Sequence, residues 1–393
     1  MKLLFVNTLY APNVVGGAER STQWLAEAFA QQGNEVSVAT LSREGRLTSE
    51  ILNQVQVHRL PLANLYWPWD GKKHTGSPLW HLRDIDNPTM GRRFGQLLED
   101  IRPDVVHTNS LAGFSVSVWR SCARRGIPII HTQRDYYLLC GNSSMFRRGR
   151  NCDGPCVRCR LFQLRKRELS SLVSGVVGNS QYILETHAQQ GFFPSAKFQR
   201  VIWSAYRAPD DASVLPSRTE VQPLRLGFFG RQTPEKGIEL LLAAGAKLAE
   251  KVEVMIAGAG DEDYVNGLRS RYPGATFLGL QRPADFFRKI DVLVVPSLWH
   301  EPLARVVIEA NVHGVPVIAT DRGGSPELIR PGVNGFLFDP DFPEQLDAAI
   351  KAFLDEPALK VRLRAGCLAM AEHFKPAQVA ASYLSAYEDV LAA

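Results

Sequence analysis

Short runs of β-branched and aromatic residues alternate with helical patterns along the whole chain, and this alternation limits the possible folds most. It is typical of βα repeats with mostly parallel sheets. Strands are predicted in the first half at residues 3–7, 35–40, 55–60, 105–108, 127–132 and 175–178. In the second half they are predicted at 225–229, 253–257, 276–278, 292–295, 316–319 and 335–338. The sequence therefore predicts an α/β protein.

The length of 393 residues exceeds that of most single cores, so two domains are expected. Residues 207–223 are rich in proline and short polar residues and are predicted to form the linker. We expect two Rossmann-like domains, residues 1–204 and 205–375, with a cleft between them. A C-terminal helix at 376–393 is expected to join the first domain.

Composition excludes several classes of protein. Apolar residues make up 45% and charged residues 22% of the chain, which is ordinary for a globular enzyme and argues against disorder. The N-terminal apolar run is too short for a signal peptide, and no stretch of 18 or more apolar residues occurs. We therefore expect a soluble, cytoplasmic protein.

The segment SLWHEPLARVVIEA, residues 297–310, places Glu301 and Glu309 eight residues apart. A helix predicted over 303–313 follows a strand, and its N-terminal N–H groups would attract phosphate. Eight helical residues span about 12 Å, too far for the carboxylate pair of a glycosidase, which needs roughly 5 to 9.5 Å. The two acids would then contact different parts of one ligand. Alternatively, Glu301 caps the helix and Glu309 is solvated.

A second candidate phosphate site lies in LGFFGRQTPEKGIELLLAA, residues 226–244. A predicted strand ends at Gly230, and the following turn carries Arg231 and Lys236. Two cations in such a turn suit a diphosphate, although a solvated turn is the alternative. The segment lacks the glycine-lysine-serine/threonine pattern of a Walker loop.

These segments resemble family 4 glycosyltransferases, the retaining group 1 transferases with the GT-B fold. Residues 297–310 resemble the family's Glu-x7-Glu signature, and 230–237 its diphosphate turn. The match continues through 314–319, 323–327 and 332–336, and Gly16-Gly17 with Glu19-Arg20 resembles the N-terminal glycine loop. The motifs cover most of the chain in the family's order.

The resemblance implies a retaining transferase that moves a sugar from a nucleoside-diphosphate sugar to an acceptor hydroxyl without a divalent metal. Arg231 and Lys236 would bind the donor diphosphate, Glu309 the ribose and Glu301 the transferred sugar. Gly16, Gly17, Gly230, Leu303 and Ala304 would complete the donor site. Two cations and a helix N-terminus could stabilise the leaving diphosphate. The product would be a surface polysaccharide, lipopolysaccharide or lipid-linked glycan.

Acceptor-side roles are less well defined by the motifs. His107 ends a predicted strand, is expected to face the cleft and is included among the catalytic residues, although a packed histidine fits as well. Arg134 and Asp135 are likewise candidate acceptor-side residues, with a packing role as the alternative. The sequence departs from the family at Ala304, where glycine is frequent, and at Arg134, where histidine is frequent.

Cys140, Cys152, Cys156 and Cys159 fall within twenty residues as C-x11-C-x3-C-x2-C. A structural zinc explains such a cluster in a cytoplasmic chain, with free thiols, disulfides and an iron–sulfur cluster as alternatives. Residues 147–167 overlap this loop and hold eight basic residues against the single acid Asp153. The run suits an anionic membrane surface at which the chain would be peripheral, or an anionic lipid-linked acceptor, or it is a solvated face.

No nucleic-acid-binding module surrounds the basic run, so nucleic acid is not expected as a partner. Two other functions remain at this stage. GT-B sugar-nucleotide epimerases share the expected fold but lack this Glu-x7-Glu helix, and a non-catalytic sugar-nucleotide-binding scaffold would not need all four charged residues.

Overall fold

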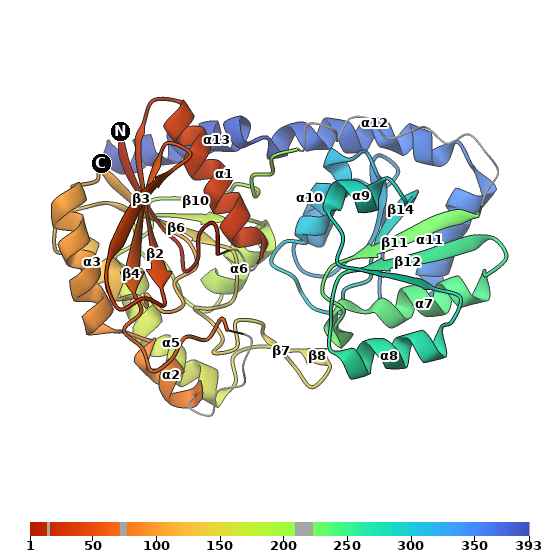
Figure 1. The fold of residues 1–393 in the computed structure, drawn as a ribbon, viewed down its shortest axis with the longest axis horizontal. Coiled ribbons are helices and arrows are strands. Elements are labelled where there is room, and N and C mark those ends of the chain that lie inside the picture. Colours follow the sequence, from red (N-terminus) through yellow and green to blue (C-terminus); the bar gives the residue numbers. More distant parts are fainter. Residues whose placement is uncertain (14–15, 71–76, 209–222, 393) are drawn as a thin grey trace. The chain divides into compact units, whose positions relative to one another are not determined.

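A computed structural model describes residues 1–13, 16–70, 77–208 and 223–392 (Figure 1). The chain forms two compact units. Unit 1 comprises Met1–Met145, Cys152–Tyr206 and Pro376–Ala393; unit 2 comprises Phe146–Asn151 and Arg207–Lys375. Most of the predicted linker, residues 209–222, lies outside the described residues.

Unit 1 contains an eight-stranded sheet among its described residues. Its order is β10 (Gln199–Val201), β9 (Gly175–Gly178), β6 (Ile129–Gln133), β5 (Val105–Thr108), β1 (Lys2–Val6), β2 (Glu35–Ser42), β4 (Val55–Pro61) and β3 (Thr48–Leu52). All neighbours are parallel except β3, which pairs antiparallel with β4. The short edge strands β3 and β10 were not predicted.

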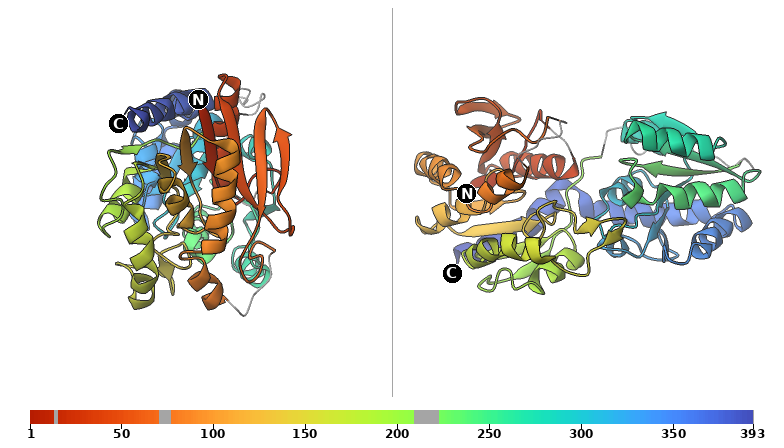
Figure 2. Two further views of the ribbon diagram at one scale, coloured as in Figure 1. Left: turned by 90° about the vertical axis from the view of Figure 1, so that its left-hand side faces the viewer. Right: turned by 90° about the horizontal axis from the view of Figure 1, so that it is seen from below.

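Helices lie on both faces of this sheet (Figure 2). They are α1 (Gly17–Gln31), α2 (Ser77–Arg83), α3 (Pro88–Ile101), α4 (Ser117–Ala123), α5 (Val157–Ser170), α6 (Gln181–Ala188) and α13 (Pro376–Leu391). Helix α13 packs against α1 (Figure 1). Its buried side chains Val379, Tyr383 and Tyr387 belong to the same hydrophobic core as strands β1 and β2. The C-terminal residues therefore complete the core of unit 1.

Unit 2 contains a six-stranded parallel sheet. Its order is β13 (Thr276–Gly279), β12 (Val252–Ala257), β11 (Leu224–Phe229), β14 (Val292–Val295), β15 (Val317–Thr320) and β16 (Gly335–Phe338). The chain winds one way from β11 and then returns to the other side of it at β14. Ligands of such sheets bind at the carboxyl ends of the strands where the winding reverses. The loops after β11 and β14 are therefore the expected ligand loops.

The helices of unit 2 are α7 (Ile238–Lys247), α8 (Glu262–Arg271), α9 (Pro283–Phe287), α10 (Arg305–Val312), α11 (Glu344–Asp355) and α12 (Leu359–Ala371). Three short 3-10 helices are η1 (Pro234–Lys236), η2 (Ser325–Leu328) and η3 (Glu372–Phe374). Helices α7 and α11 pack together, as do α10 and α12. Leucines of α7 and the apolar residues Leu346, Ile350 and Phe353 of α11 share one core with β11, β12 and β14.

A two-stranded hairpin, β7 (Phe146–Arg147) and β8 (Arg150–Asn151), departs from the predicted domain boundaries. The prediction placed all of residues 1–204 in one domain. The chain instead leaves unit 1 after Met145, contributes six residues to unit 2 and re-enters unit 1 at Cys152. The hairpin lies within the cysteine-rich basic loop.

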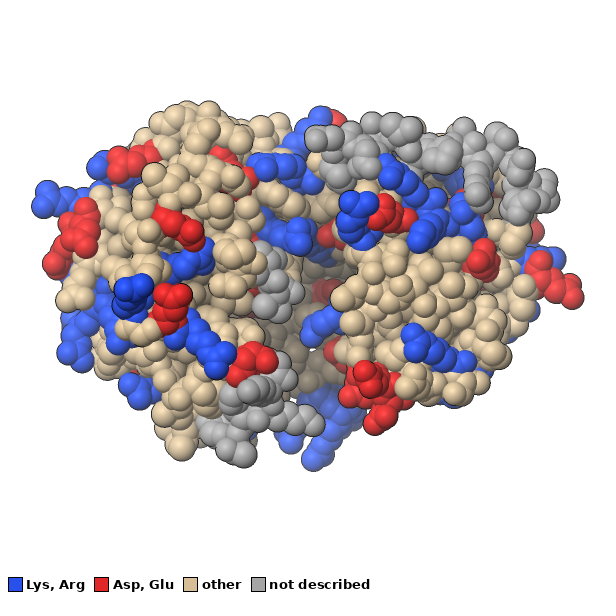
Figure 3. Space-filling view, in the orientation of Figure 1, with Lys and Arg blue, Asp and Glu red and all other residues tan. Residues whose placement is uncertain are grey.

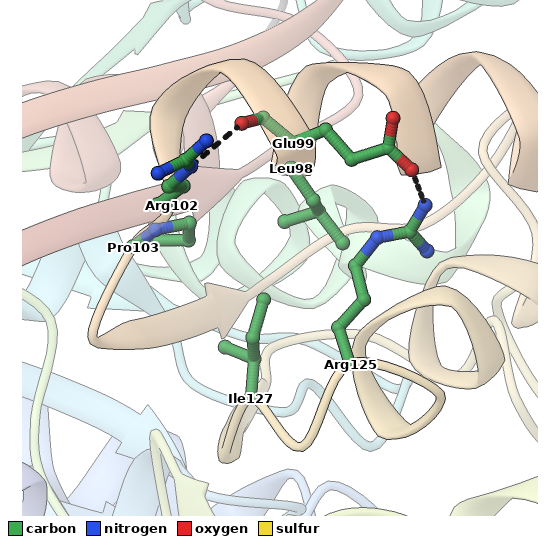
Figure 4. Close-up of a pocket in the computed structure, with 6 residues that line it drawn as sticks. All are labelled: Leu98, Glu99, Arg102, Pro103, Arg125 and Ile127. Carbon is green, nitrogen blue, oxygen red and sulfur yellow. Dashed lines mark hydrogen bonds and ion pairs between the residues drawn. The ribbon is translucent and has the colours of Figure 1, made fainter.

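A surface hollow of unit 1 lies away from the expected ligand end (Figure 4). Pro103 and Ile127 line it, and these residues precede β5 and β6 at the amino ends of the strands. Arg125 and Glu99 form an ion pair beside it. Because ligands of parallel sheets bind at the carboxyl ends of the strands, this hollow is not a candidate active site. No helix among the described residues is both long and apolar enough to cross a membrane.

Candidate functional site

The candidate site is built where the loops after β11 and β14 meet. Lys236 ends η1 after β11, and Glu301 lies in the loop that follows β14. Lys236 Nζ lies 2.8 Å from Glu301 Oε2, and the two side chains are only 16% and 9% exposed. The ring of Trp299 also lies 5.3 Å from Lys236 Nζ. Two residues predicted from separate motifs are therefore in direct contact.

Backbone hydrogen bonds hold the loop that carries Glu301. The N–H groups of Leu298 and Trp299 both donate to Glu235 O, at 3.0 and 3.2 Å. Glu301 N–H donates to Trp299 O at 2.8 Å, and Glu301 O accepts from Gly324 N–H at 2.8 Å. The loop is thus fixed from the β11 side by η1 and from the other side by the segment after β15.

Two glycines make these close contacts possible. Gly237 has φ +65°, and a Cβ there would lie 1.9 Å from Pro296 O. Gly323 has φ +62°, and a Cβ there would lie 2.3 Å from Glu301 O. Both the positive φ and the missing Cβ are required, so any other residue would displace the Glu301 loop.

Glu301 retains hydrogen-bonding capacity. Its Oε2 contacts Lys236, whereas its Oε1 is buried and has no hydrogen-bond partner among the described residues. Gln232 Oε1, Thr233 Oγ1 and Ser325 Oγ share this condition and lie in segments after β11 and β15. A buried polar atom without a partner costs about 1–3 kcal/mol, so such atoms indicate where a polar ligand binds. All three positions lie within the motifs at residues 226–244 and 323–327, but no role was predicted for them.

Arg231 and the N-terminus of α10 have unused hydrogen-bonding groups among the described residues. Arg231 is exposed and forms no ion pair within the described part of the chain. Ala304 is the N-cap of α10, and no hydrogen bond of the Leu303 or Ala304 N–H group occurs among the described residues. Unbonded N–H groups at a helix N-terminus attract anions.

Glu309 lies in the second turn of α10, with Oε1 3.1 Å from Nε of Arg305. The helix begins at Arg305 rather than at the predicted residue 303. Glu301 therefore lies in the preceding loop, and the predicted 12 Å helical separation from Glu309 does not apply. Pro302 and the contacts of the Glu301 loop delay the first helical turn. Glu309 is buried, so the alternative in which it is a solvated helix residue does not hold.

Comparisons with known proteins agree with this arrangement. Residues 16–201 match the model of a "Glycosyl transferase 4-like domain", and residues 223–356 match that of "Glycosyl transferases group 1". An uncharacterized 42.6 kDa protein in the cps region of Klebsiella pneumoniae is 34% identical over 84% of this chain and 88% of its own length. The chain belongs to the group 1 glycosyltransferases.

A GDP-mannose-dependent alpha-mannosyltransferase of Mycolicibacterium smegmatis is similar to this glycosyltransferase, with 29% identity over 91% of this chain and 89% of the relative. Among solved structures, Anabaena HepE in complex with UDP and glucose has a TM-score of 0.71 and 20% identity. That match covers 99% of this chain and 100% of HepE. Sucrose-phosphate synthase from Thermosynechococcus elongatus has a TM-score of 0.76, with 100% and 99% coverage and 20% identity. The fold is GT-B, as predicted.

In unit 1 of the transferase, the predicted glycine loop precedes α1. Gly16 is the N-cap of this helix, and Gly17 is its first residue. Gly16 N–H donates to Glu19 Oε2 at 2.8 Å, so Glu19 satisfies one of the free N–H groups at the helix start. Gly16 and Gly17 lie after β1, at the carboxyl edge of the unit 1 sheet. Their role in donor binding stays a prediction.

Arg134 and Asp135 are held by side chains of unit 1. Arg134 Nε donates to Asn109 Oδ1 at 2.9 Å, and its Nη1 lies 3.1 Å from the hydroxyls of Ser21 and Ser204. Asp135 accepts hydrogen bonds from Ser110 Oγ and from the backbone N–H of Tyr137. Burial raises the pKa of Asp135. Both residues therefore lie at the carboxyl end of β6, and their acceptor-side role stays a prediction.

His107 does not face a ligand site. It is fully buried in unit 1, and its ring nitrogens lie 2.7 Å from Tyr387 Oη and 2.7 Å from Thr132 Oγ1. Burial lowers the pKa of His107 well below its ordinary value. Helix α13 covers the end of β5, so the prediction that His107 faces the cleft was wrong. Both ring nitrogens are used in packing, and none is left for a substrate.

The four clustered cysteines do not form a ready metal site. No group of three or more histidine, cysteine or acidic side chains in the described part of the chain is arranged to hold a metal ion. Burial, with Cys140 and Cys156 nearby, raises the pKa of the Cys159 thiol to about 12. The thiols as placed do not fit zinc, which binds thiolates tetrahedrally. The predicted zinc stays a prediction, which elemental analysis tests: one zinc per chain supports it, and four titratable thiols without zinc refute it.

The basic run is not one continuous surface. Lys166 is buried and donates to Tyr137 O at 2.8 Å, and Arg165 pairs with Asp86 and Glu168. The remaining cations are exposed, and three of them belong to the unit 2 hairpin: Arg147, Arg148 and Arg150. Figure 3 shows basic side chains gathered at the lower edge of the view, over β7 and β8. The run therefore supplies two smaller basic groups rather than one face of eight.

Proposed function

We propose that the chain is a retaining glycosyltransferase that moves a sugar from a nucleoside-diphosphate sugar to an acceptor hydroxyl. One observation carries this proposal: Lys236 contacts one oxygen of Glu301, while the other oxygen is buried and has no partner in the described part of the chain. A cation for phosphate and a carboxylate oxygen for sugar hydroxyls thus lie side by side at the reversal of winding in the sheet.

Each charged group then has a distinct part in donor binding. Arg231 and Lys236 bind the diphosphate oxygens, together with the N–H groups that begin α10. Glu309 accepts hydrogen bonds from the ribose hydroxyls. Glu301 accepts hydrogen bonds from the transferred sugar and orients its anomeric carbon. The positive charge of Lys236, which contacts Glu301 Oε2, offsets the repulsion between this carboxylate and the phosphate.

In the proposed reaction the bond between the anomeric carbon and the phosphate oxygen breaks, and its electron pair stays with the nucleoside diphosphate. The acceptor oxygen bonds to the anomeric carbon on the same face. The acceptor proton passes to the departing phosphate oxygen. Arg231, Lys236 and the helix N-terminus stabilise the charge that develops on the leaving group, so we propose that no divalent metal is needed.

The relatives suggest the class of substrate. One relative is encoded in a cps region, another uses GDP-mannose, and a structure of similar fold was solved with UDP and glucose. We therefore propose a role in surface polysaccharide, lipopolysaccharide or lipid-linked glycan synthesis. An acceptor at an anionic membrane surface would suit the exposed arginines of the hairpin and α5.

Incubation with a panel of nucleoside-diphosphate sugars tests this function. Release of the nucleoside diphosphate that depends on acceptor, with retention at the anomeric carbon, is expected. Epimerised donor would instead indicate an isomerase, and binding without turnover a scaffold. Glu301→Gln should abolish most turnover, whereas Glu344→Gln, an exposed glutamate of α11, is the matched control.

A further inference from the structure

The side chain of Asn151 joins the hairpin to the loop that carries Glu301. Asn151 Nδ2 donates to Leu298 O at 2.8 Å, and Asn151 Oδ1 accepts from His300 N–H at 2.9 Å. Both ends of one amide are therefore used, and only an amide of this length supplies a donor and an acceptor together. Asn151 lies 147 and 149 residues from these partners in the sequence.

These two bonds add to the other hydrogen bonds that hold the loop at residues 297–301. The η1 segment binds the N–H groups of Leu298 and Trp299, and Gly324 binds Glu301 O. Thr320 Oγ1 binds Ser297 O. Asn151 adds the bonds to Leu298 O and to His300 N–H. Without Asn151, these two hydrogen bonds to the backbone just before Glu301 would be lost.

We propose that Asn151 is a positioning residue for Glu301. It acts through the backbone of residues 298–300 and does not touch the substrate. This inference rests on the proposed function of Glu301 as the group that orients the donor sugar. The hairpin is then part of the donor site, although it lies within the cysteine-rich loop of the sequence.

A positioning role for Asn151 affects the orientation of the donor sugar but not the binding of the nucleoside diphosphate. Arg231, Lys236, Glu309 and the N-terminus of α10 are proposed to bind the nucleoside diphosphate. The side chain of Asn151 bonds instead to the backbone of Leu298 and His300. Loss of Asn151 should leave nucleoside diphosphate affinity nearly unchanged. The orientation of the sugar should suffer, because a displacement of about 1 Å in a positioning group lowers rates up to about 100-fold.

Amide hydrogen exchange tests the contact without reference to activity. In Asn151→Ala the His300 amide should exchange at least about tenfold faster, since its acceptor is gone. Asn151→Asp keeps an acceptor for His300 N–H, so the His300 amide should stay protected. The bond to Leu298 O is lost, because a carboxylate oxygen replaces the amide donor. Asn142→Ala, an exposed asparagine of the same loop, should change neither. Unchanged exchange at His300 in Asn151→Ala would overturn the proposal.

Kinetics test the positioning role. Asn151→Ala should lower kcat about tenfold, which corresponds to about 1.4 kcal/mol, while the Kd of the nucleoside diphosphate changes by less than about threefold. A parallel loss of kcat and of nucleoside diphosphate affinity would indicate a general structural defect and would overturn the positioning role. If the wild-type chain transfers no sugar from any donor, the proposed function fails, while the exchange result still decides whether Asn151 holds the loop.

Discussion

Glu301 of unit 2 and His107 of unit 1 were both predicted to be catalytic residues near the end of a parallel strand, but their surroundings in the structure differ. Each follows or ends a parallel strand, and each is almost fully buried. His107 uses both ring nitrogens in contacts with Tyr387 and Thr132, whereas one oxygen of Glu301 has no partner among the residues that the structure describes. Burial at a strand end thus does not identify a functional residue. Unused hydrogen-bonding capacity in a buried group is the better indication, because it costs free energy unless a ligand or an ordered water satisfies it.

The largest expected effect comes from Lys236→Ala. It removes a phosphate ligand and also leaves the nearly buried Glu301 carboxylate without its cation. Loss of a charged phosphate ligand costs about 1.5–3 kcal/mol, and Glu301 loses its position as well, so kcat/KM should fall by roughly 100-fold or more. Steady-state kinetics with saturating acceptor measure this loss.

Lys247→Ala is the matched control for Lys236→Ala, because Lys247 forms an exposed ion pair with Asp347. An exposed pair contributes about 0–1 kcal/mol, so this variant should remain active. The double variant Lys236→Ala with Glu301→Gln should lose less than the sum of the two single losses. Fully additive losses would show that the two side chains act independently and would contradict the contact.

Next in size is the difference between the two glutamates. Removal of a charged hydrogen-bond partner costs about 1.5–3 kcal/mol, or roughly 10- to 150-fold. Glu301→Gln should place this loss in kcat, and Glu309→Gln should place it in donor affinity, because one contacts the reacting sugar and the other the ribose. Isothermal titration with the nucleoside diphosphate separates the two effects. Wild-type kinetics in both variants would show that the site is wrongly assigned.

Local patterns predicted much of the donor unit. The strands of unit 2 were placed to within one or two residues, since each is a short apolar run bounded by glycine, proline or polar residues. Gly237 and Gly323 lie in the quoted motifs, and their positive φ angles fit the turns expected there. The motifs also singled out Lys236 and Glu301. What they could not give is the 2.8 Å contact between residues 65 positions apart, which depends on the order of the strands.

The errors have the same physical origin. His107 could not be assigned because its partner Tyr387 lies 280 residues away on α13. Asn151 was missed because its amide binds backbone atoms, which leave no pattern in the sequence. Lys166 and Arg165 were counted in a basic run, although one is buried and the other paired. Each error concerns a long-range contact of a single side chain.

A smaller effect, on stability rather than turnover, is expected for His107→Phe. The change leaves the hydroxyls of Tyr387 and Thr132 without the ring nitrogens, so unfolding should become easier by about 1–3 kcal/mol. Turnover per folded molecule should change less than about threefold, because no substrate group depends on His107. Tyr387→Phe, which removes one of the two bonds, should give a smaller loss. A large fall in kcat of a folded His107→Phe protein would show that His107, like Glu301, contributes to catalysis.

The dependence of stability on pH provides a signature of this packing role. Burial lowers the pKa values of three histidines of unit 1. The pKa of His107 falls well below its ordinary value, that of His131 falls to about 3, and that of His187 falls to about 4. The unfolded chain, with histidine pKa values of about 6.5, then binds more protons below that pH than the folded chain does. Stability should therefore fall as the pH drops below about 6.5, by up to about 1.4 kcal/mol per pH unit for each histidine. His107→Phe should reduce this slope by the share of one histidine.

The smallest effect concerns the cations that, unlike Lys236, have no acidic partner. Arg147, Arg148 and Arg150 are exposed on the hairpin and form no ion pair among the described residues. Near an anionic bilayer each contributes about 1 kcal/mol, so the chain should float with anionic vesicles at low salt. Binding should weaken at high salt, because the Debye length falls from about 10 Å at 0.1 M to about 3 Å at 1 M. Replacing all three by glutamine should weaken flotation while leaving transfer to a soluble acceptor intact. Equal binding to neutral vesicles, or none to anionic ones, would mean that these arginines are an ordinary solvated surface without a role at membranes.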